Sequence, residues 1–283
     1  SAEALKRFGM VARNPERDVQ RRAVAIDFGT SSTVVAVDTA NGGRELLRIG
    51  VRDFYEAVQP KHFENPTVLE CVDFSAFEAA WTQRAYRPEL NWNWMRAAHE
   101  AQASFRDNPG DTEILASILP KLKQWALRSE RSQVRLTDRK GKEMQLAPHI
   151  ERNPVRGQAL QITQDYPFDP IELYAWYLGM AINWRERGLF LKYYLSFPVK
   201  YPREVKDRIL ASFRRGLQRS LPQTLIEHHP QVLNDFEVND WASEPAAYAA
   251  AAMAHLGIDP TEEGVPYAVF DFGGGTTDFD FGL

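Results

Sequence analysis

The sequence predicts an α/β fold in which a mixed β-sheet is flanked by helices. One observation is a pair of apolar strand patterns at 22–28 and 33–39, with a tight turn between them. A second is that strand patterns alternate with helical patterns from residue 169 onward. Hairpins followed by alternating strands and helices are typical of a mixed sheet packed by helices.

Length and composition are those of a globular protein. The 283 residues are 44% hydrophobic and 25% charged, enough for two domains or one large one. A net charge of −4 gives no electrostatic footprint for nucleic acid. The single cysteine, Cys71, excludes an intrachain disulfide and fits a reducing compartment. We find no apolar run of about 18 residues and no signal-peptide pattern, so we expect a cytoplasmic protein without a membrane partner.

The first third of the chain is expected to contain a β-meander and then an irregular insertion. Residues 1–21 are polar and basic, which predicts a solvated tail or short helix. A turn signal at 41–43 leads to a predicted strand near 44–50. Residues 76–160 predict a mostly helical subdomain, with a helix near 111–128 and a hairpin or loop in the polar stretch 129–145.

Four tryptophans in this region have two interpretations. They are Trp81, Trp92, Trp94 and Trp125. Large aromatic side chains mostly pack in cores, so we expect them to be core residues. The alternative is a partner-docking surface particular to this protein.

The second half predicts a regular succession of elements. Asp169-Pro170 is an N-cap followed by proline at the first helical position, and Gly188 ends that helix. The next predicted elements are a strand at 189–197, a helix from Pro202, a strand at 235–239 and a helix at roughly 243–256. Val205, Ile209, Phe213 and Leu217 give the second helix one apolar face. Ser243 or the preceding residue can cap the last helix, and Gly257 ends it.

Two segments share a construction suited to binding phosphate. Residues 23–37 read AVAIDFGTSSTVVAV and residues 267–282 read YAVFDFGGGTTDFDFG. In each, an apolar strand leads into an aspartate, glycine and hydroxyl residues, and a second strand. Glycine permits the close approach by which backbone N–H groups converge on an anion. Two such hairpins suggest two lobes that hold one polyphosphate, although each alone could be an ordinary glycine-rich hairpin. A GxxxxGK[ST] loop is absent from the sequence, which disfavours a P-loop enzyme.

This paired pattern resembles the ATPase superfamily that contains the Hsp70 chaperones, actin and the sugar kinases. In that superfamily the two segments are called phosphate-1 and phosphate-2. Residues 195–201 (LSFPVKY) are similar to a strand end of the family, and 242–250 (ASEPAAYAA) are similar to its Asn-Glu-Pro-x-Ala-Ala-Ala helix start. Asn65-Pro66-Thr67-Val68-Leu69 is similar to its Pro-Ser-x-Val strand. The Glu-Pro helix start favours the Hsp70-like branch.

The resemblance implies an actin-like, ribonuclease H-like ATPase architecture. The first lobe would span 22–258, with the insertion-rich subdomain at about 76–160, and a second lobe would start at 265–283. The match covers 22–39 and 165–283 well and the stretch between them poorly. The gap between the two hairpins is longer than in the chaperones, so we expect the middle subdomain to be elaborated.

The resemblance also implies ATP and Mg²⁺ as cofactors. Asp27 and Asp271 would hold Mg²⁺ through water, because paired carboxylates repel without a cation between them. The phosphates would be held by Gly29, Thr30, Ser31, Ser32, Gly273, Gly274, Gly275, Thr276 and Thr277.

Three further residues would take part in catalysis. Glu244 would position the attacking water, although a capping acid is its alternative role. Asp278 would lie near the metal and the water, or else be a turn acid. Lys123, with Lys121 as the second choice, would stabilise charge in the transition state, unless it is an ordinary surface lysine.

The function implied is Mg²⁺-dependent ATP hydrolysis that drives a chaperone-type conformational change, with a protein client or co-chaperone as a further partner. One alternative is an actin-like filament protein. Another is a nucleotide-sensing or inactive scaffold whose tryptophan-rich insertion binds a partner. A sugar kinase would need a sugar-binding acid that we do not locate in the sequence.

The family's adenosine-binding lobe would follow phosphate-2. We therefore expect ATPase activity in the full-length protein, and weak or no ATP binding and no turnover by residues 1–283 alone. Isothermal calorimetry tests this expectation, and a sub-micromolar affinity of the isolated chain for ATP would contradict it.

Overall fold

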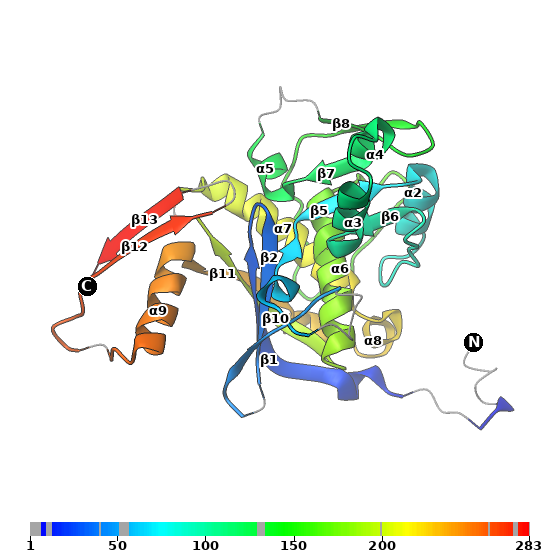
Figure 1. The fold of residues 1–283 in the computed structure, drawn as a ribbon. Helices are drawn as coiled ribbons and strands as arrows, with labels where there is room; N and C mark the ends of the chain where they lie inside the picture. Colours follow the sequence, from blue (N-terminus) through cyan, green and yellow to red (C-terminus); the bar gives the residue numbers. More distant parts are fainter. Residues whose placement is uncertain are drawn as a thin grey trace.

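The computed structural model describes residues 7–9, 13–39, 41–50, 57–128, 134–198, 200–259, 261–273 and 277–282. A mixed six-stranded sheet lies at its centre, with helices packed against it (Figure 1). The predicted α/β class is therefore confirmed. None of the helices in the described part of the chain combines the length and the apolar character that a membrane span requires.

The central sheet positions the strands that lead to the candidate site. Its strands are β1 (Val19–Phe28), β2 (Ser32–Asp38), β3 (Arg44–Leu46), β4 (Asn65–Pro66), β10 (Leu189–Phe197) and β11 (Glu237–Ser243). They are arranged in the order β11-β10-β1-β2-β3, and β4 pairs with β2. β1 is parallel to β10, β10 is parallel to β11, and β1 is antiparallel to β2. The carboxyl ends of β1, β10 and β11 therefore meet at one edge, where open α/β sheets commonly bind ligands.

Two long helices, α6 (Pro170–Arg185) and α7 (Arg203–Arg219), pack closely against each other. Glycine makes this approach feasible, because a Cβ on Gly216 would lie 2.2 Å from the backbone oxygen of Glu172. Likewise, a Cβ on Gly179 would lie 2.5 Å from the Ser220 hydroxyl. The two helices therefore form one layer beside the sheet.

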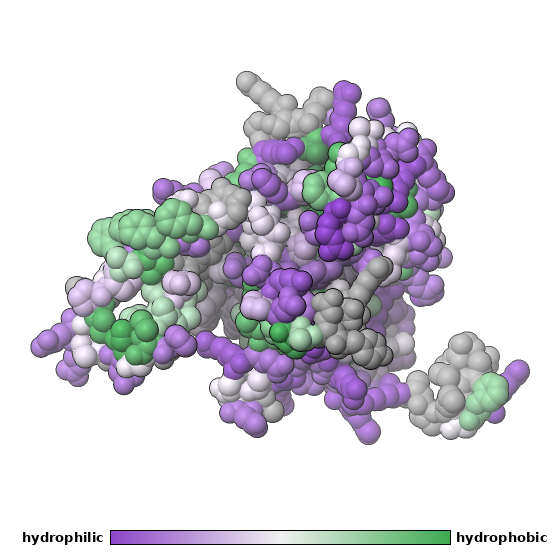
Figure 2. Space-filling view, viewed as in Figure 1, coloured by the Kyte–Doolittle hydropathy of each residue, from purple (hydrophilic) through white to green (hydrophobic). Residues whose placement is uncertain are grey.

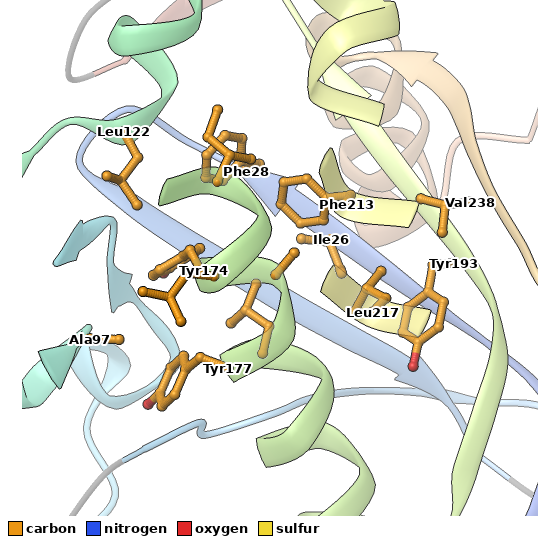
Figure 3. Close-up of a cluster of buried hydrophobic side chains, with 14 of the residues drawn as sticks. Ile26, Phe28, Ala97, Leu122, Tyr174, Tyr177, Tyr193, Phe213, Leu217 and Val238 are labelled. Atoms are coloured by element: carbon orange, nitrogen blue, oxygen red, sulfur yellow. The ribbon is translucent and has the colours of Figure 1, made fainter. Parts of the chain in front are cut away.

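The core lies between this helical layer and the sheet (Figure 3). Ile26 and Phe28 of β1 are buried there together with Phe213 and Leu217 of α7. The rings of Phe28 and Phe213 meet edge to face, with centroids 5.0 Å apart. The predicted apolar face of the second helix is confirmed, since all four of its members are buried.

A buried ion-pair network joins α6 to α7. Glu172, which has no exposed surface, lies 2.6 Å from Nε of Arg215 and 3.0 Å from Nη1 of Arg219. The Tyr166 hydroxyl donates to the same carboxylate at 2.8 Å. Arg219 also stacks on the Trp81 ring and donates to the Ala85 carbonyl oxygen, which ties the helices to the insertion.

The insertion has the expected helices and hairpin, but it also contains strands that pair with β5 (Val68–Cys71), so the mostly helical subdomain is confirmed only in part. Its helices are α2 (Phe74–Gln83), α3 (His99–Asp107), α4 (Thr112–Ser117) and α5 (Leu122–Leu127). Its strands are β5 (Val68–Cys71), β6 (Met95–Ala97) and β7 (Ile118–Pro120), which form a sheet, and β8 (Val134–Thr137) and β9 (Glu143–Leu146), which form the hairpin predicted in 129–145.

The helix predicted near 111–128 is interrupted by β7. Pro120 has no backbone N–H and disfavours helical geometry at Leu119 before it. Leu119 and Ile118 pair with β5 instead, and Lys121 then adopts a positive φ of 55° before α5 begins. Strand pairing and proline chemistry together outweigh the helical periodicity.

The tryptophan prediction is largely confirmed. Trp81 and Trp125 are buried in the core, and Trp94 is half-buried against it. Trp92 is the exception, because 44% of its surface is exposed.

Several boundaries also differ from the prediction. β1 begins at Val19 and so takes part of the expected 1–21 tail, while β3 stops at Leu46. The strand expected at 235–239 is β11, which starts two residues later because η3 (Pro230–Asn234) precedes it. β10 lies where the sequence places it, and α6 and α7 start as expected, but α6 ends at Arg185 and Arg187 rather than Gly188 adopts the left-handed conformation after it. α9 (Glu244–Leu256) is capped by the Ser243 hydroxyl, 3.3 Å from the Ala246 nitrogen.

β12 (Tyr267–Phe272) and β13 (Thr277–Gly282) form a two-stranded sheet of their own beyond the β11 edge (Figure 1). Phe and Asp alternate along both strands, and the register Phe270↔Phe279 and Asp271↔Asp278 separates these residue types onto opposite faces. The phenylalanine face is exposed, and apolar side chains are conspicuous there in Figure 2. The exposed phenylalanines are Phe270, Phe272, Phe279 and Phe281.

The ion-pair network predicts a large stability effect. Glu172→Gln keeps the side-chain shape but leaves two buried guanidinium groups without their full countercharge. We expect a loss of about 3–5 kcal/mol in the free energy of unfolding, the usual cost of breaking a buried pair. Urea denaturation of the two proteins measures it.

The matched control for this prediction is Glu89→Gln, which breaks an exposed pair with Arg84. It should cost less than about 1 kcal/mol. Equal small losses for both variants would show that the buried network does not hold the helices together.

Candidate functional site

The turn that follows β1 is shaped by a glycine. The Gly29 N–H donates to the Asp27 carbonyl oxygen at 3.1 Å. A Cβ at Gly29 would lie 2.3 Å from the backbone oxygen of Ser32, closer than any side chain can approach. The turn between β1 and β2 therefore requires glycine at this position.

A threonine from another segment braces the same turn. The Thr67 hydroxyl donates to the Gly29 carbonyl oxygen at 3.0 Å, and its backbone N–H donates to the Ser31 oxygen at 3.0 Å. Its hydroxyl also lies 3.0 Å from that of Thr33. Thr67 thus fixes the path of the loop over residues 29–31. The sequence alone indicates only that this Asn-Pro-Thr segment is similar to a strand of the family; it does not predict the hydrogen bonds of Thr67 to the loop.

Asp27 is the second-last residue of β1. It is exposed, and its Oδ1 accepts a hydrogen bond of 3.0 Å from the hydroxyl of Ser196 on β10. The surrounding protein partly dehydrates the carboxylate and raises its pKa above the ordinary value. The charge of Lys123 and the Ser196 hydrogen bond lower the pKa, and the charge of Asp271 raises it further.

Two residues that are far from Asp27 in the sequence are therefore within electrostatic reach of it. Lys123 comes from α5 in the insertion, and Asp271 comes from the end of β12. The sequence predicts Asp27, Lys123 and Asp271 in one site. In the structure, Lys123 and Asp271 are both near enough to Asp27 for their charges to act on it.

Lys123 is an unusual lysine because only 2% of its surface is exposed. Its ammonium group lies 5.1 Å from the centroid of the Tyr201 ring, which follows β10. The positive φ of Lys121 turns the chain into α5, and Lys121 itself is exposed. The interpretation of Lys123 as an ordinary surface lysine is therefore wrong, and Lys123 rather than Lys121 is the residue near Asp27.

The two aspartates suit a divalent cation held through water. Mg²⁺ is commonly bound by one or two carboxylates, several waters and substrate phosphates rather than by a cage of protein ligands. Among the described residues we find no group of three or more His, Cys, Asp or Glu side chains arranged to hold a metal. Burial is the main cause of the raised pKa of Asp27, and repulsion by Asp271 adds to it; a cation between the carboxylates would relieve that repulsion.

The predicted phosphate ligands divide into three groups. Ser31, Gly273 and Thr277 are exposed at the two turns, and Ser32 is half-buried. Thr30 is buried, with 7% of its surface exposed, so its side chain belongs to the packing of the loop. Gly274, Gly275 and Thr276 lie outside the described residues.

Two of the predicted catalytic acids are placed only by their backbone. Glu244 is the first residue of α9, directly after β11. Asp278 pairs across the hairpin with Asp271. Their side-chain positions lie outside the described part of the structure.

Sequence reasoning missed Ser196, Thr67 and Tyr201 as members of the site. Ser196 and Tyr201 lie within residues 195–201, which were singled out for their similarity to a family strand end. Their roles depend on which strand lies next to β1, and that information is absent from local sequence.

Comparison with models of known protein families gave no match, and comparison with curated proteins gave none either.

The raised pKa of Asp27 leads to a stability prediction. The folded protein disfavours the ionised form of Asp27, so the free energy of unfolding is lower at a pH above the folded-state pKa. This loss is absent at a pH below the pKa of the unfolded chain, about 3.9. Without metal or nucleotide, Asp27→Asn should therefore raise the melting temperature at pH 7, and the difference should narrow as the pH falls toward 4.

Thermal unfolding in EDTA at both pH values provides the measurement. Asp38→Asn, at a surface position on β2, is the control and should show no such pH-dependent gain. A greater loss of stability in Asp27→Asn at pH 7 than at pH 4 would contradict the prediction.

Proposed function

We propose that this chain contributes to a Mg²⁺-dependent ATPase of the Hsp70-like kind. The observation that carries the proposal is that the charges of Lys123 and Asp271 both act on Asp27, near the carboxyl end of β1. A buried cation and a second acid that both act on Asp27, beside the turn after β1, are an arrangement suited to a polyphosphate with its metal.

The turns would bind the phosphates through their backbone. Thr67 holds the loop over residues 29–31, so the N–H groups of Thr30 and Ser31 need little reorganisation when an anion arrives. The N–H of Gly29 is already bonded to the Asp27 carbonyl oxygen. The exposed hydroxyls of Ser31 and Thr277 can donate to phosphate oxygens from the two sides. These contacts orient the triphosphate without any covalent step.

Lys123 would supply a fixed positive charge. The protein surrounds its side chain, and the Tyr201 ring lies against its ammonium group. A preorganised cation stabilises negative charge on the transferring phosphoryl group more effectively than a mobile, hydrated one.

Asp27 and Asp271 would hold the waters around Mg²⁺. The Ser196 hydroxyl orients Asp27 for this task. When bound, Mg²⁺ would neutralise charge on the β- and γ-phosphate oxygens. Glu244 would orient the attacking water from the start of α9, as the family resemblance suggests.

We propose that hydrolysis controls how the β12–β13 hairpin is held. The β12–β13 hairpin forms its own sheet and packs against α9. Nucleotide held by both turns would couple the hairpin to the sheet, and hydrolysis would release that coupling. By family resemblance we propose a chaperone-type change that serves a client or co-chaperone.

The proposal predicts the effect of removing individual charges. We expect the full-length protein to hydrolyse ATP in the presence of Mg²⁺. Asp27→Asn, Glu244→Ala and Lys123→Met should each lower the turnover at least about tenfold, which is roughly 1.4 kcal/mol of barrier. Phosphate release at saturating ATP measures it.

Lys121→Met is the matched control, because Lys121 is exposed two residues from Lys123. It should keep nearly full turnover. If the wild type binds ATP but does not hydrolyse it, the ATPase proposal fails and the scaffold alternative takes its place.

A further inference from the structure

A two-part depression lies around the carboxyl end of α6, at the end of β10 opposite to the candidate site. One part is an apolar pocket of about 290 Å³ between α6 and the β6 region of the insertion. The other is a larger depression of about 620 Å³ around the loop that joins α6 to β10. Met180 and Trp184 line both parts, so the two are continuous.

The apolar part is lined by large flexible and aromatic side chains. They include Leu90, Trp92, Met95, Trp176, Tyr177 and Trp184. Trp184 is 72% exposed and Trp92 is 44% exposed, although most of the other tryptophans pack in the core. Exposed tryptophans beside an apolar pocket are typical of interfaces where a few residues carry most of the binding energy.

The second part of the depression is basic. Arg13, Arg87, Arg185 and Arg187 line it, and Asp18 is its only acidic lining residue. Asp18 is already paired with Arg13 at 2.5 Å. Within the described residues, no carboxylate forms an ion pair with any of the other three arginines. The depression therefore presents positive charge that no carboxylate of the described residues neutralises.

Two of these arginines have an unusual backbone conformation. Arg87 and Arg187 have φ values of 46° and 49°, in the left-handed region. Arg187 follows the end of α6, a position where glycine is the common residue because it has no Cβ to clash. At the end of α6 this conformation closes the helix, with the Gly188 N–H donating to the Asn183 carbonyl oxygen, and the chain places a guanidinium there where glycine would be less strained.

We propose that this depression binds a peptide segment of a protein partner, in which one large apolar side chain lies close to several acidic residues. The apolar pocket has the volume for one such side chain. The adjoining arginines complement carboxylates a few residues along the same segment. This site does not depend on the proposed ATPase activity, because none of its lining residues belongs to the candidate nucleotide site.

Fluorescence anisotropy with the whole chain tests the proposal. The probes are fluorescein-labelled twelve-residue peptides that carry one Leu, Phe, Met or Trp, a spacer of one to three residues and four glutamates. We expect at least one to bind with micromolar affinity. Replacement of its apolar residue by glycine, or of its glutamates by lysine, should weaken binding at least tenfold, and added salt should weaken it as well.

Two variants locate the binding without endangering the fold. Trp184→Ser changes a side chain that is mostly in solvent. Arg187→Gly introduces the residue best suited to its positive φ. Each should weaken binding at least tenfold while leaving the melting temperature unchanged or, for Arg187→Gly, raised.

The matched controls are Trp241→Ser, at an exposed tryptophan on β11, and Arg203→Ala, at an exposed arginine on α7. They should bind the peptide as the wild type does. The proposal is overturned if no probe binds more tightly than its glycine-substituted version. It is also overturned if Trp184→Ser and Trp241→Ser weaken binding equally.

Discussion

The buried contact between Glu172 and the guanidinium groups of Arg215 and Arg219 is the interaction on which the arrangement of this protein depends. Three charges without water are tolerable only when their geometry is fixed, so the network sets how α6 lies against α7. Gly216 allows the backbones to come close enough for the pairs to form. The helical layer in turn packs on β1 and β10, the strands that carry Asp27 and Ser196.

This rigid layer explains how the candidate site can hold charges that oppose one another. Asp27 and Asp271 raise each other's energy, and Lys123 offsets part of that cost from a position where water barely reaches it. A flexible scaffold would let the carboxylates separate. Here the Ser196 hydrogen bond and the Thr67 hydrogen bonds hold Asp27 and the loop over residues 29–31 in place. The repulsion between the two carboxylates therefore persists until a cation binds and relieves it.

The helical layer also separates two regions of different chemistry. The carboxyl ends of β1 and β10 present acids and tight turns, while the carboxyl end of α6 presents tryptophans and arginines. Both regions are anchored on the same buried layer, but they share no residue. The phenylalanine face of β12–β13 is a third surface, built by the strict alternation of Phe and Asp along two paired strands.

The sequence by itself determined the elements whose signals are local: the hairpin turns, the N-cap at Asp169, β10, and the apolar face of α7. It also indicated the acids at the ends of β1 and β12, because an aspartate before a glycine turn is visible without a partner. Only the tertiary structure decided that 111–128 breaks at Pro120, that Lys123 rather than Lys121 approaches Asp27, and that Ser196 and Thr67 complete the site. Those outcomes depend on which strands become neighbours. The energy of long-range strand pairing outweighs local periodicity, and it cannot be read from the local sequence.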